Sequence, residues 1–226
     1  MNCGKLNLRT GNMVDLTRYV AAQLHNMFPD GSLEQDVEMI IDTIPQALER
    51  MRPILSAVRT FDPDTFNHLN SLQYATFLYL LGNENWRIKS SGVIADRLFC
   101  LNRALNAMDL FYTVEMPEVF LVAHGLGSVL GNVTYGNRLV FFHNVTVGRV
   151  GDHRPTIGEN VILYPGATIT GRSKIGNNSV VSAGAVVHNI CVPDNVVVIP
   201  QGSKLVFQPL KRDYLSLYLR SHVNVR

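Results

Sequence analysis

Three of the seven histidines stand where an imidazole could take part in chemistry. His124 precedes a run of small residues, His143 lies among the repeats described below, and His153 falls in a short polar segment. Histidine is the usual general base near neutral pH, and such a base contributes about 100- to 10,000-fold in rate. A hydrogen-bonded structural role is the alternative for each of them. His143 is better placed in a coil wall or at a subunit interface than as a base.

A metal site built from these histidines is not predicted. They include no pair spaced four residues apart, and no cysteine lies at metal-ligand spacing from them. The cysteines, Cys3, Cys100 and Cys191, share no such spacing with one another either. They are therefore expected to be reduced thiols.

The elements that must position these histidines follow a period of six residues. The period is typical of a β-helix, in which stacked coils bury a shared interior column. The count slips between Gly148 and Ile157, so residues 149–156 are expected to leave the coils as a loop, where reactive side chains are often presented. The apolar residues of the repeat are Tyr135, Phe141, Val147, Ile157, Leu163, Ile169, Ile175, Val181 and Val187.

The segments on either side of the repeats differ in pattern. Apolar residues between residues 13 and 111 fall at helix-face spacings, and β-branched and turn residues take over at 114–119. We therefore predict an α+β protein with an α-helical domain at 1–113 and a β-helix at 114–206. The tail, 207–226, is amphipathic and is expected to form a helix that covers the last coil.

Composition limits the possible functions. The chain has 226 residues and a formal net charge of +2, and no Lys/Arg cluster indicates nucleic-acid binding. No apolar run approaches the roughly 20 residues that a membrane span needs. The N-terminus lacks a signal-peptide pattern, so a cytoplasmic location is expected.

Several segments together resemble the serine acetyltransferase family of hexapeptide acyltransferases. HGLGSVLGN at 124–132 is similar to the family segment in which a catalytic histidine precedes small residues. GDHRPTIG at 151–158 is similar to the loop motif Asp-Arg-His-Pro, and RTFDPD at 59–64 to Arg-Thr-Arg-Asp-Pro. The remaining matches are NVTVG at 144–148, VVSAGAVV at 180–187 and IPQGSKLV at 199–206.

The resemblance implies a left-handed parallel β-helix after a helical domain, assembled as a homotrimer or a dimer of trimers. It implies transfer of acetyl from acetyl-CoA to an acceptor hydroxyl, with His124 as the general base and no metal. CoA would lie in a groove between coils of neighbouring subunits. By position in the matching segments, the CoA-binding residues would be Gly148, Ala167, Ala183 and Lys204, and the acceptor-binding residues Asp62, His153 and Arg154.

Two departures from the family pattern concern the acceptor. The family has an aspartate directly before the catalytic histidine, where this chain has Ala123. The family loop reads Arg then His before proline, whereas this chain has His153 and then Arg154. On an extended chain, a shift by one position turns a side chain to the opposite side.

Three hypotheses follow. The departures favour an O-acetyltransferase whose acceptor is a sugar of a surface polysaccharide or its precursor. The alternative is L-serine O-acetylation in cysteine biosynthesis, which Asp62, Arg154 and the helical domain favour. A third hypothesis, a non-catalytic trimeric scaffold, would be indicated by a failure to bind CoA.

Overall fold

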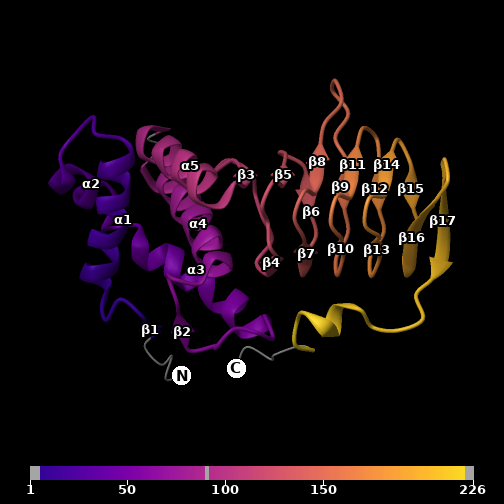
Figure 1. Ribbon diagram of the computed structural model, residues 1–226, viewed down its shortest axis with the longest axis horizontal. Helices are drawn as coiled ribbons and strands as arrows, with labels where there is room; N and C mark the ends of the chain where they lie inside the picture. Colours follow the sequence, from indigo (N-terminus) through magenta and orange to yellow (C-terminus); the bar gives the residue numbers. More distant parts are fainter. Residues whose placement is uncertain (1–5, 90–91, 222–226) are drawn as a thin grey trace.

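The computed structural model describes residues 6–89 and 92–221, and shows a helical half followed by a β-helical half (Figure 1). Cys3 and the last five residues of the predicted tail lie outside the described residues. No helix within the described ranges is long and apolar enough to cross a membrane. The helices are α1 Met13–Met27, α2 Leu33–Ile40, α3 Ile44–Ala57, α4 Ser71–Lys89 and α5 Gly92–Asn106. A short parallel pair, β1 Asn7–Leu8 and β2 Thr65–Phe66, joins the N-terminal arm to this half.

Local signals explain where the first helices begin. The Asn12 side chain accepts a hydrogen bond from the Asp15 amide at 3.0 Å, which caps α1. Ser32 and Gln35 form a capping box at the start of α2. Pro45 lies in the first turn of α3, where its missing N–H is not needed, so this proline begins a helix and does not interrupt one.

The β-helix consists of strands that form three faces, all paired in parallel except β16 with β17. It is left-handed, as the resemblance implies. The nine apolar positions of the six-residue repeat are all buried, which confirms the interior column. The β4 face contains β4 Phe120–Val122, β7 Leu139–Phe141, β10 Ile162–Leu163, β13 Val180–Val181, β16 Val196–Gln201 and β17 Lys204–Pro209. The β5 face contains β3 Asp109–Leu110, β5 Val129–Leu130, β8 Thr146–Gly148, β11 Thr168–Thr170 and β14 Val186–His188. The β6 face contains β6 Thr134–Tyr135, β9 Thr156–Ile157, β12 Lys174–Ile175 and β15 Cys191–Val192.

Buried polar contacts join the two halves. The Tyr79 hydroxyl on α4 donates to the Val114 carbonyl at 2.5 Å and accepts from the Met116 amide at 3.2 Å. The Asn83 amide, one turn further along α4, donates to the Tyr112 carbonyl at 2.6 Å. Because buried polar groups need partners, these contacts fix α4 against the entry to the coils.

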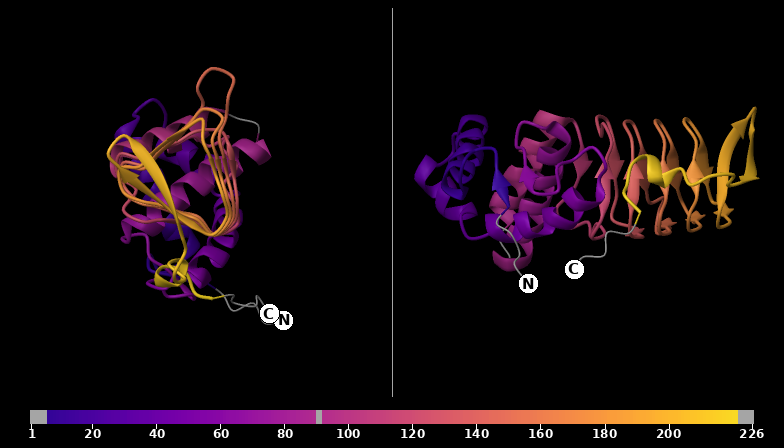
Figure 2. Two further views of the ribbon diagram at one scale, coloured as in Figure 1. Left: turned by 90° about the vertical axis from the view of Figure 1, so that its right-hand side faces the viewer. Right: turned by 90° about the horizontal axis from the view of Figure 1, so that it is seen from below.

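The described part of the tail is not an α-helix. After β17, which pairs antiparallel with β16, the chain runs back along the β4 face toward the helical half and forms only a short 3-10 turn at Leu215–Leu217 (Figure 2). Its apolar side chains pack on the coils, and its backbone bonds to the helical half: the Arg59 amide donates to the Tyr218 carbonyl at 2.9 Å. The tail is therefore an extended strap and not the expected helix. Its amphipathic pattern reflects one apolar side that packs on the sheet.

Candidate active site

His124 stands at a corner of the first coil, two residues after β4 ends. Its φ is 57°, and its side chain is exposed. It lines a pocket of about 110 Å³ between the coil and the helical half. The other lining residues are Ser71, Leu72 and Ala75 of α4, Leu105 and Asn106 of α5, and Met108, Val122, Gly125 and Leu126.

The small residues after His124 allow the chain to turn at this corner. A Cβ at Gly125 would overlap the Val122 side chain. A Cβ at Gly127 would overlap the Asn144 side chain of the next coil, and the Gly127 φ of 72° also disfavours other residues. The glycines therefore bring the histidine corner close to the neighbouring coil.

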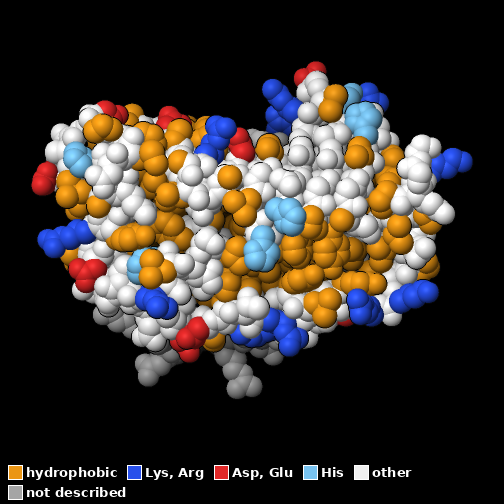
Figure 3. Space-filling view, viewed as in Figure 1, with side chains coloured by type: hydrophobic (Ala, Val, Ile, Leu, Met, Phe, Trp, Pro, Cys, Tyr) orange, Lys and Arg blue, Asp and Glu red, His pale blue; other side chains and the backbone are white. Residues whose placement is uncertain are grey.

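His143 occupies the same corner one coil further on. The strand register pairs Val122 with Phe141, and each histidine follows its strand by two residues. The two imidazoles therefore belong to neighbouring rungs of one corner, and adjacent strands are roughly 4.8 Å apart. Figure 3 shows histidine side chains close together near the middle of the visible face, beside an apolar area. His143 is partly buried and His124 is exposed.

The predicted excursion loop between β8 and β9 is present. Val150 and His153 close it with two backbone hydrogen bonds of 2.9 and 3.1 Å. The Arg172 guanidinium, which can only donate, lies 2.6 Å from Nε2 of His153, so this imidazole already has a partner. Arg154 is exposed and has no hydrogen bond or ion pair within the described ranges. Of these two loop residues, Arg154 is the one free to meet a ligand.

Asp62 is exposed on the loop that follows α3. Its carboxylate accepts from the Asp64 amide at 3.0 Å, which orders the turn at Pro63. No hydrogen bond or ion pair among the described residues joins Asp62, His153 or Arg154 to His124. Within the described part of one chain, the predicted acceptor residues are therefore not bonded to the predicted base.

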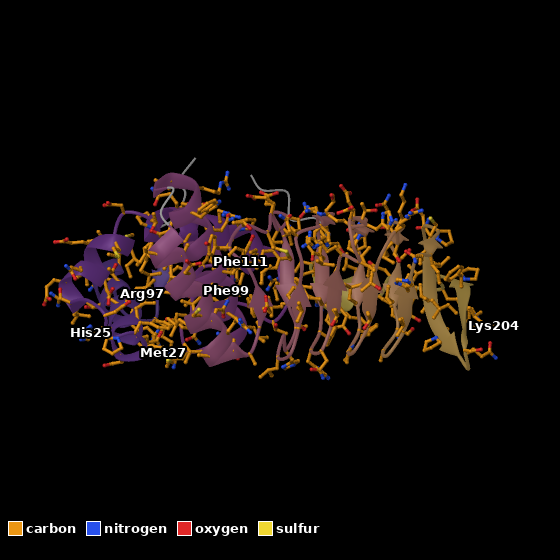
Figure 4. The ribbon with its side chains drawn as sticks, turned by 90° about the horizontal axis from the view of Figure 1, so that it is seen from above. His25, Met27, Arg97, Phe99, Phe111 and Lys204 are labelled. Carbon is orange, nitrogen blue, oxygen red and sulfur yellow. The ribbon has the colours of Figure 1, made fainter. Side chains whose placement is uncertain are left out.

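The four predicted CoA residues lie in different environments. Ala183 is exposed two residues after Val181, at the His124 corner but three rungs along, roughly 14 Å away at the usual strand spacing. Gly148 ends β8 beside open space. Lys204 is exposed at the far end of the coils from His25 (Figure 4).

Ala167 differs from the other three. It is fully buried, its amide donates to the Tyr164 carbonyl at 3.0 Å, and its carbonyl accepts from the Thr146 amide at 2.9 Å. Its position therefore leaves no side-chain surface for a ligand.

Ala123, directly before His124, is buried, and its amide donates to the Phe141 carbonyl at 2.8 Å. The corner thus has an apolar residue where the resemblance leads one to expect a carboxylate. Ser71 and Asn106 are polar lining residues that the sequence analysis did not identify. They come from two helices whose apposition to the coil no local motif encodes.

Comparisons with known proteins agree with the repeat pattern and the fold. Residues 154–189 match the family described as bacterial transferase hexapeptide (six repeats). A serine acetyltransferase from Staphylococcus aureus is 27% identical over 150 residues, which cover 62% of this chain and 70% of that protein.

Among solved structures, the serine acetyltransferase from Brucella abortus in complex with coenzyme A has a TM-score of 0.65 at 20% identity, covering 87% of this chain and 82% of that one. The Neisseria gonorrhoeae serine acetyltransferase in complex with serine has a TM-score of 0.62 at 20% identity, covering 87% and 86%.

Proposed function

We propose that this chain, a hexapeptide-repeat acyltransferase similar to the serine acetyltransferases, transfers the acetyl group of acetyl-CoA to the hydroxyl of L-serine. The observation that carries this proposal is the position of His124. It is an exposed imidazole at a coil corner and lines a pocket of about 110 Å³, a volume suited to a small acceptor. The similarity to serine acetyltransferases favours L-serine over the sugar acceptor that the sequence departures suggested.

The reaction needs one proton carrier. His124 takes the proton of the serine hydroxyl as that oxygen attacks the thioester carbonyl carbon. The tetrahedral intermediate then collapses, the carbon–sulfur bond breaks, and the imidazolium returns the proton to the leaving thiolate. The products are O-acetylserine and CoA. Backbone N–H groups at the corner are suited to stabilise the oxyanion.

The acceptor end of the site requires a neighbouring subunit. Among the described residues, no hydrogen bond or ion pair joins Asp62, His153 or Arg154 to His124, and we propose that a homotrimer brings the loop of one subunit to the histidine corner of the next. Arg154 is exposed and unpaired among the described residues, and its guanidinium fork suits the two oxygens of the serine carboxylate. Asp62 would bind the serine amine.

CoA would lie beside the β5 face, between the His124 corner and the opposite edge of that face. Ala183 continues the His124 corner, Gly148 ends β8 at the opposite edge beside open space, and Lys204 supplies a positive charge at the far end. Buried Ala167 would contribute only by shaping the coil behind the groove. We propose pairing of trimers through the helical halves as the alternative assembly.

A sugar acceptor is the second candidate. Buried Ala123, in place of an acid beside the histidine, removes one charged group that could recognise an amino acid. A sugar needs no such charge.

The test is release of free thiol from acetyl-CoA in the presence of L-serine or candidate glycans. Turnover with L-serine alone, abolished in the His124→Ala variant, supports the proposal. Turnover with a glycan but not with serine would favour the second candidate. A chain that forms trimers but neither binds CoA nor releases thiol would be a scaffold.

A further inference from the structure

A second cavity, of about 480 Å³, lies at the edge of the β4 face opposite the His124 corner, between the coils and the tail. Its floor is one corner of four successive coils, and residues 210–215 and Ser221 of the tail enclose it. This volume is within the range of roughly 300–1,000 Å³ that is usual for small-molecule sites. The residues at the corner are Arg138, Asn160, Asn178 and Asn195, with φ of 62°, 58°, 53° and 61°.

The three asparagines form a ladder of side-chain amides. The Asn160 amide donates to Asn178 at 2.9 Å, and the Asn178 amide donates to Asn195 at 3.1 Å. Among the described residues, Oδ1 of Asn160 and Nδ2 of Asn195 then have no hydrogen-bond partner. The ladder therefore offers an unpaired carbonyl oxygen at one end and an unpaired NH2 group at the other, a combination that suits hydroxyl groups.

Positive charge surrounds this ladder. The cavity is lined by Arg138, Lys211 and Arg212 but by one acid, Asp213. The Asp213 carboxylate already accepts from the Ser216 amide at 3.1 Å. Figure 3 shows Lys and Arg side chains along the lower edge of the coils. The excess of cations indicates an anionic occupant.

The cations are held in place by their surroundings. Arg138 is half-buried and donates to the Arg220 carbonyl at 2.9 Å, which leaves its other guanidinium N–H groups for a ligand. Arg212 stacks over the Tyr214 ring, 4.5 Å from the centroid. Positioned guanidinium groups bind phosphate oxygens in pairs, and such charge-assisted hydrogen bonds are roughly twice as strong as neutral ones.

One wall of the cavity is apolar and is formed by Val180, Leu210 and Leu215. An inorganic ion would leave this wall and much of the volume unfilled. We propose that the cavity binds an organic phosphate of the size of a sugar phosphate or a mononucleotide. The cations hold the phosphate, the asparagine ladder holds the hydroxyl-bearing part, and the apolar wall packs against the remainder.

Such a ligand would contact the coils and the tail together. Ligand that binds only when the tail is in place stabilises the folded chain by mass action. The cavity is one sheet width away from the His124 corner, and the two pockets share no lining residue. Binding here is therefore expected to occur together with acetyl-CoA.

The test uses the full-length chain in titration calorimetry and thermal unfolding, at constant ionic strength. The probes are AMP, glucose 1-phosphate and inorganic phosphate, with adenosine and glucose as unphosphorylated counterparts. We expect saturable binding of AMP or glucose 1-phosphate, a raised Tm, and no competition from acetyl-CoA. The two organic phosphates distinguish a nucleotide site from a sugar-phosphate site.

Two variants and a control complete the design. Arg138→Met and Arg212→Met are each expected to weaken binding about tenfold or more. Within the described residues, Arg212 makes no hydrogen bond or ion pair between tail and coils, so its variant tests the site without removing such a contact. Lys174→Met removes an exposed cation on the β6 face and should leave binding unchanged. The proposal is overturned if neither organic phosphate saturates, if both variants bind like the original chain, if adenosine or glucose binds equally well, or if acetyl-CoA competes.

Discussion

The hydroxyl oxygens of Tyr164 and Tyr218 lie 3.0 Å apart and join the start of a coil corner to the tail. The Tyr164 ring stacks on Phe142 of the preceding coil, with centroids 5.2 Å apart, and the Tyr218 ring packs edge-on against both. Phe142 and Tyr164 lie one residue before the corner positions of His143 and Pro165. The tail thus braces the side of the coils next to the histidine corner.

The tail also anchors the helical half through Arg220. Its guanidinium donates to backbone carbonyls at the end of α3 and in the following loop, including Ser56 at 2.7 Å, Val58 at 2.6 Å and Phe61 at 2.9 Å. A cation at a helix C-terminus is also favoured by the helix dipole. We expect Arg220→Met to lower the free energy of unfolding by about 2–4 kcal/mol, because several partly buried carbonyls lose a charged donor.

Urea unfolding measures this change. Arg220→Lys should recover part of the loss, and Lys174→Met, at an exposed position of β12, provides the baseline. Equal stability of Arg220→Met and Lys174→Met would contradict the anchoring role.

His124→Ala is expected to reduce kcat about 100- to 10,000-fold, because it removes the proposed general base. The KM for acetyl-CoA should change little, since the imidazole acts on the acceptor proton. Steady-state thiol release measures both constants. His188→Ala is the matched control, because His188 is an exposed imidazole whose ring nitrogens contact Thr170 and Asn189. Unchanged kcat in His124→Ala would remove the mechanism.

Arg154→Met is expected to raise the KM for L-serine about tenfold or more, by loss of a bidentate contact to the carboxylate. The KM for acetyl-CoA should stay the same. Arg149→Met, an exposed arginine at the start of the same loop, is the control for general effects of loop charge. If a sugar is the acceptor, the two variants should behave alike.

The sequence predicted the coils well because their geometry is strictly periodic. Each strand must bury one interior side chain, so the six-residue period of Phe141, Val147 and their successors is sufficient to locate the strands in the sequence. The loop at 149–156 was predictable for the same reason, as a break in that count. His124 could be identified because the small residues after it are required by the corner.

Other features depend on contacts between distant segments. An amphipathic tail can pack as a helix or as an extended strap, and only the partners of Tyr218 and Arg220 decide between them. The pocket beside His124 needs α4 and α5 at the coil entry, which neither helix encodes alone. The predicted acceptor residues form no bond with His124 within the described chain, so motif matching could name them but could not place them beside the base.

Gly136→Ala is expected to destabilise the coils severely. A Cβ at this position would overlap the backbone carbonyl of Gly158 in the next coil, and backbone cannot move aside as a flexible side chain does. We expect a loss of about 2 kcal/mol or more, or failure to fold. Gly148→Ala, where an added Cβ meets nothing within 4 Å, is the comparison and should change the Tm little. Equal Tm values for the two variants would show that the coils can separate at this corner.

The stability of the junction between the two halves should fall at high pH because of Tyr79. Burial raises the pKa of Tyr79 from 10.0 to about 12, since the phenolate would be desolvated. The folded chain therefore holds this proton more tightly than the unfolded chain. The contribution is fully present below pH 10, where neither state loses the proton, and it is lost as the pH rises toward 12.

Denaturant unfolding between pH 9 and pH 12, compared with Tyr79→Phe, checks this prediction. The variant should be less stable at pH 9, because the Val114 carbonyl and the Met116 amide lose their partner. It should also lose less stability than the original chain as the pH rises, since it has one fewer buried tyrosine to ionise. Parallel pH profiles for the two proteins would mean that Tyr79 ionises in the folded state without opening the junction.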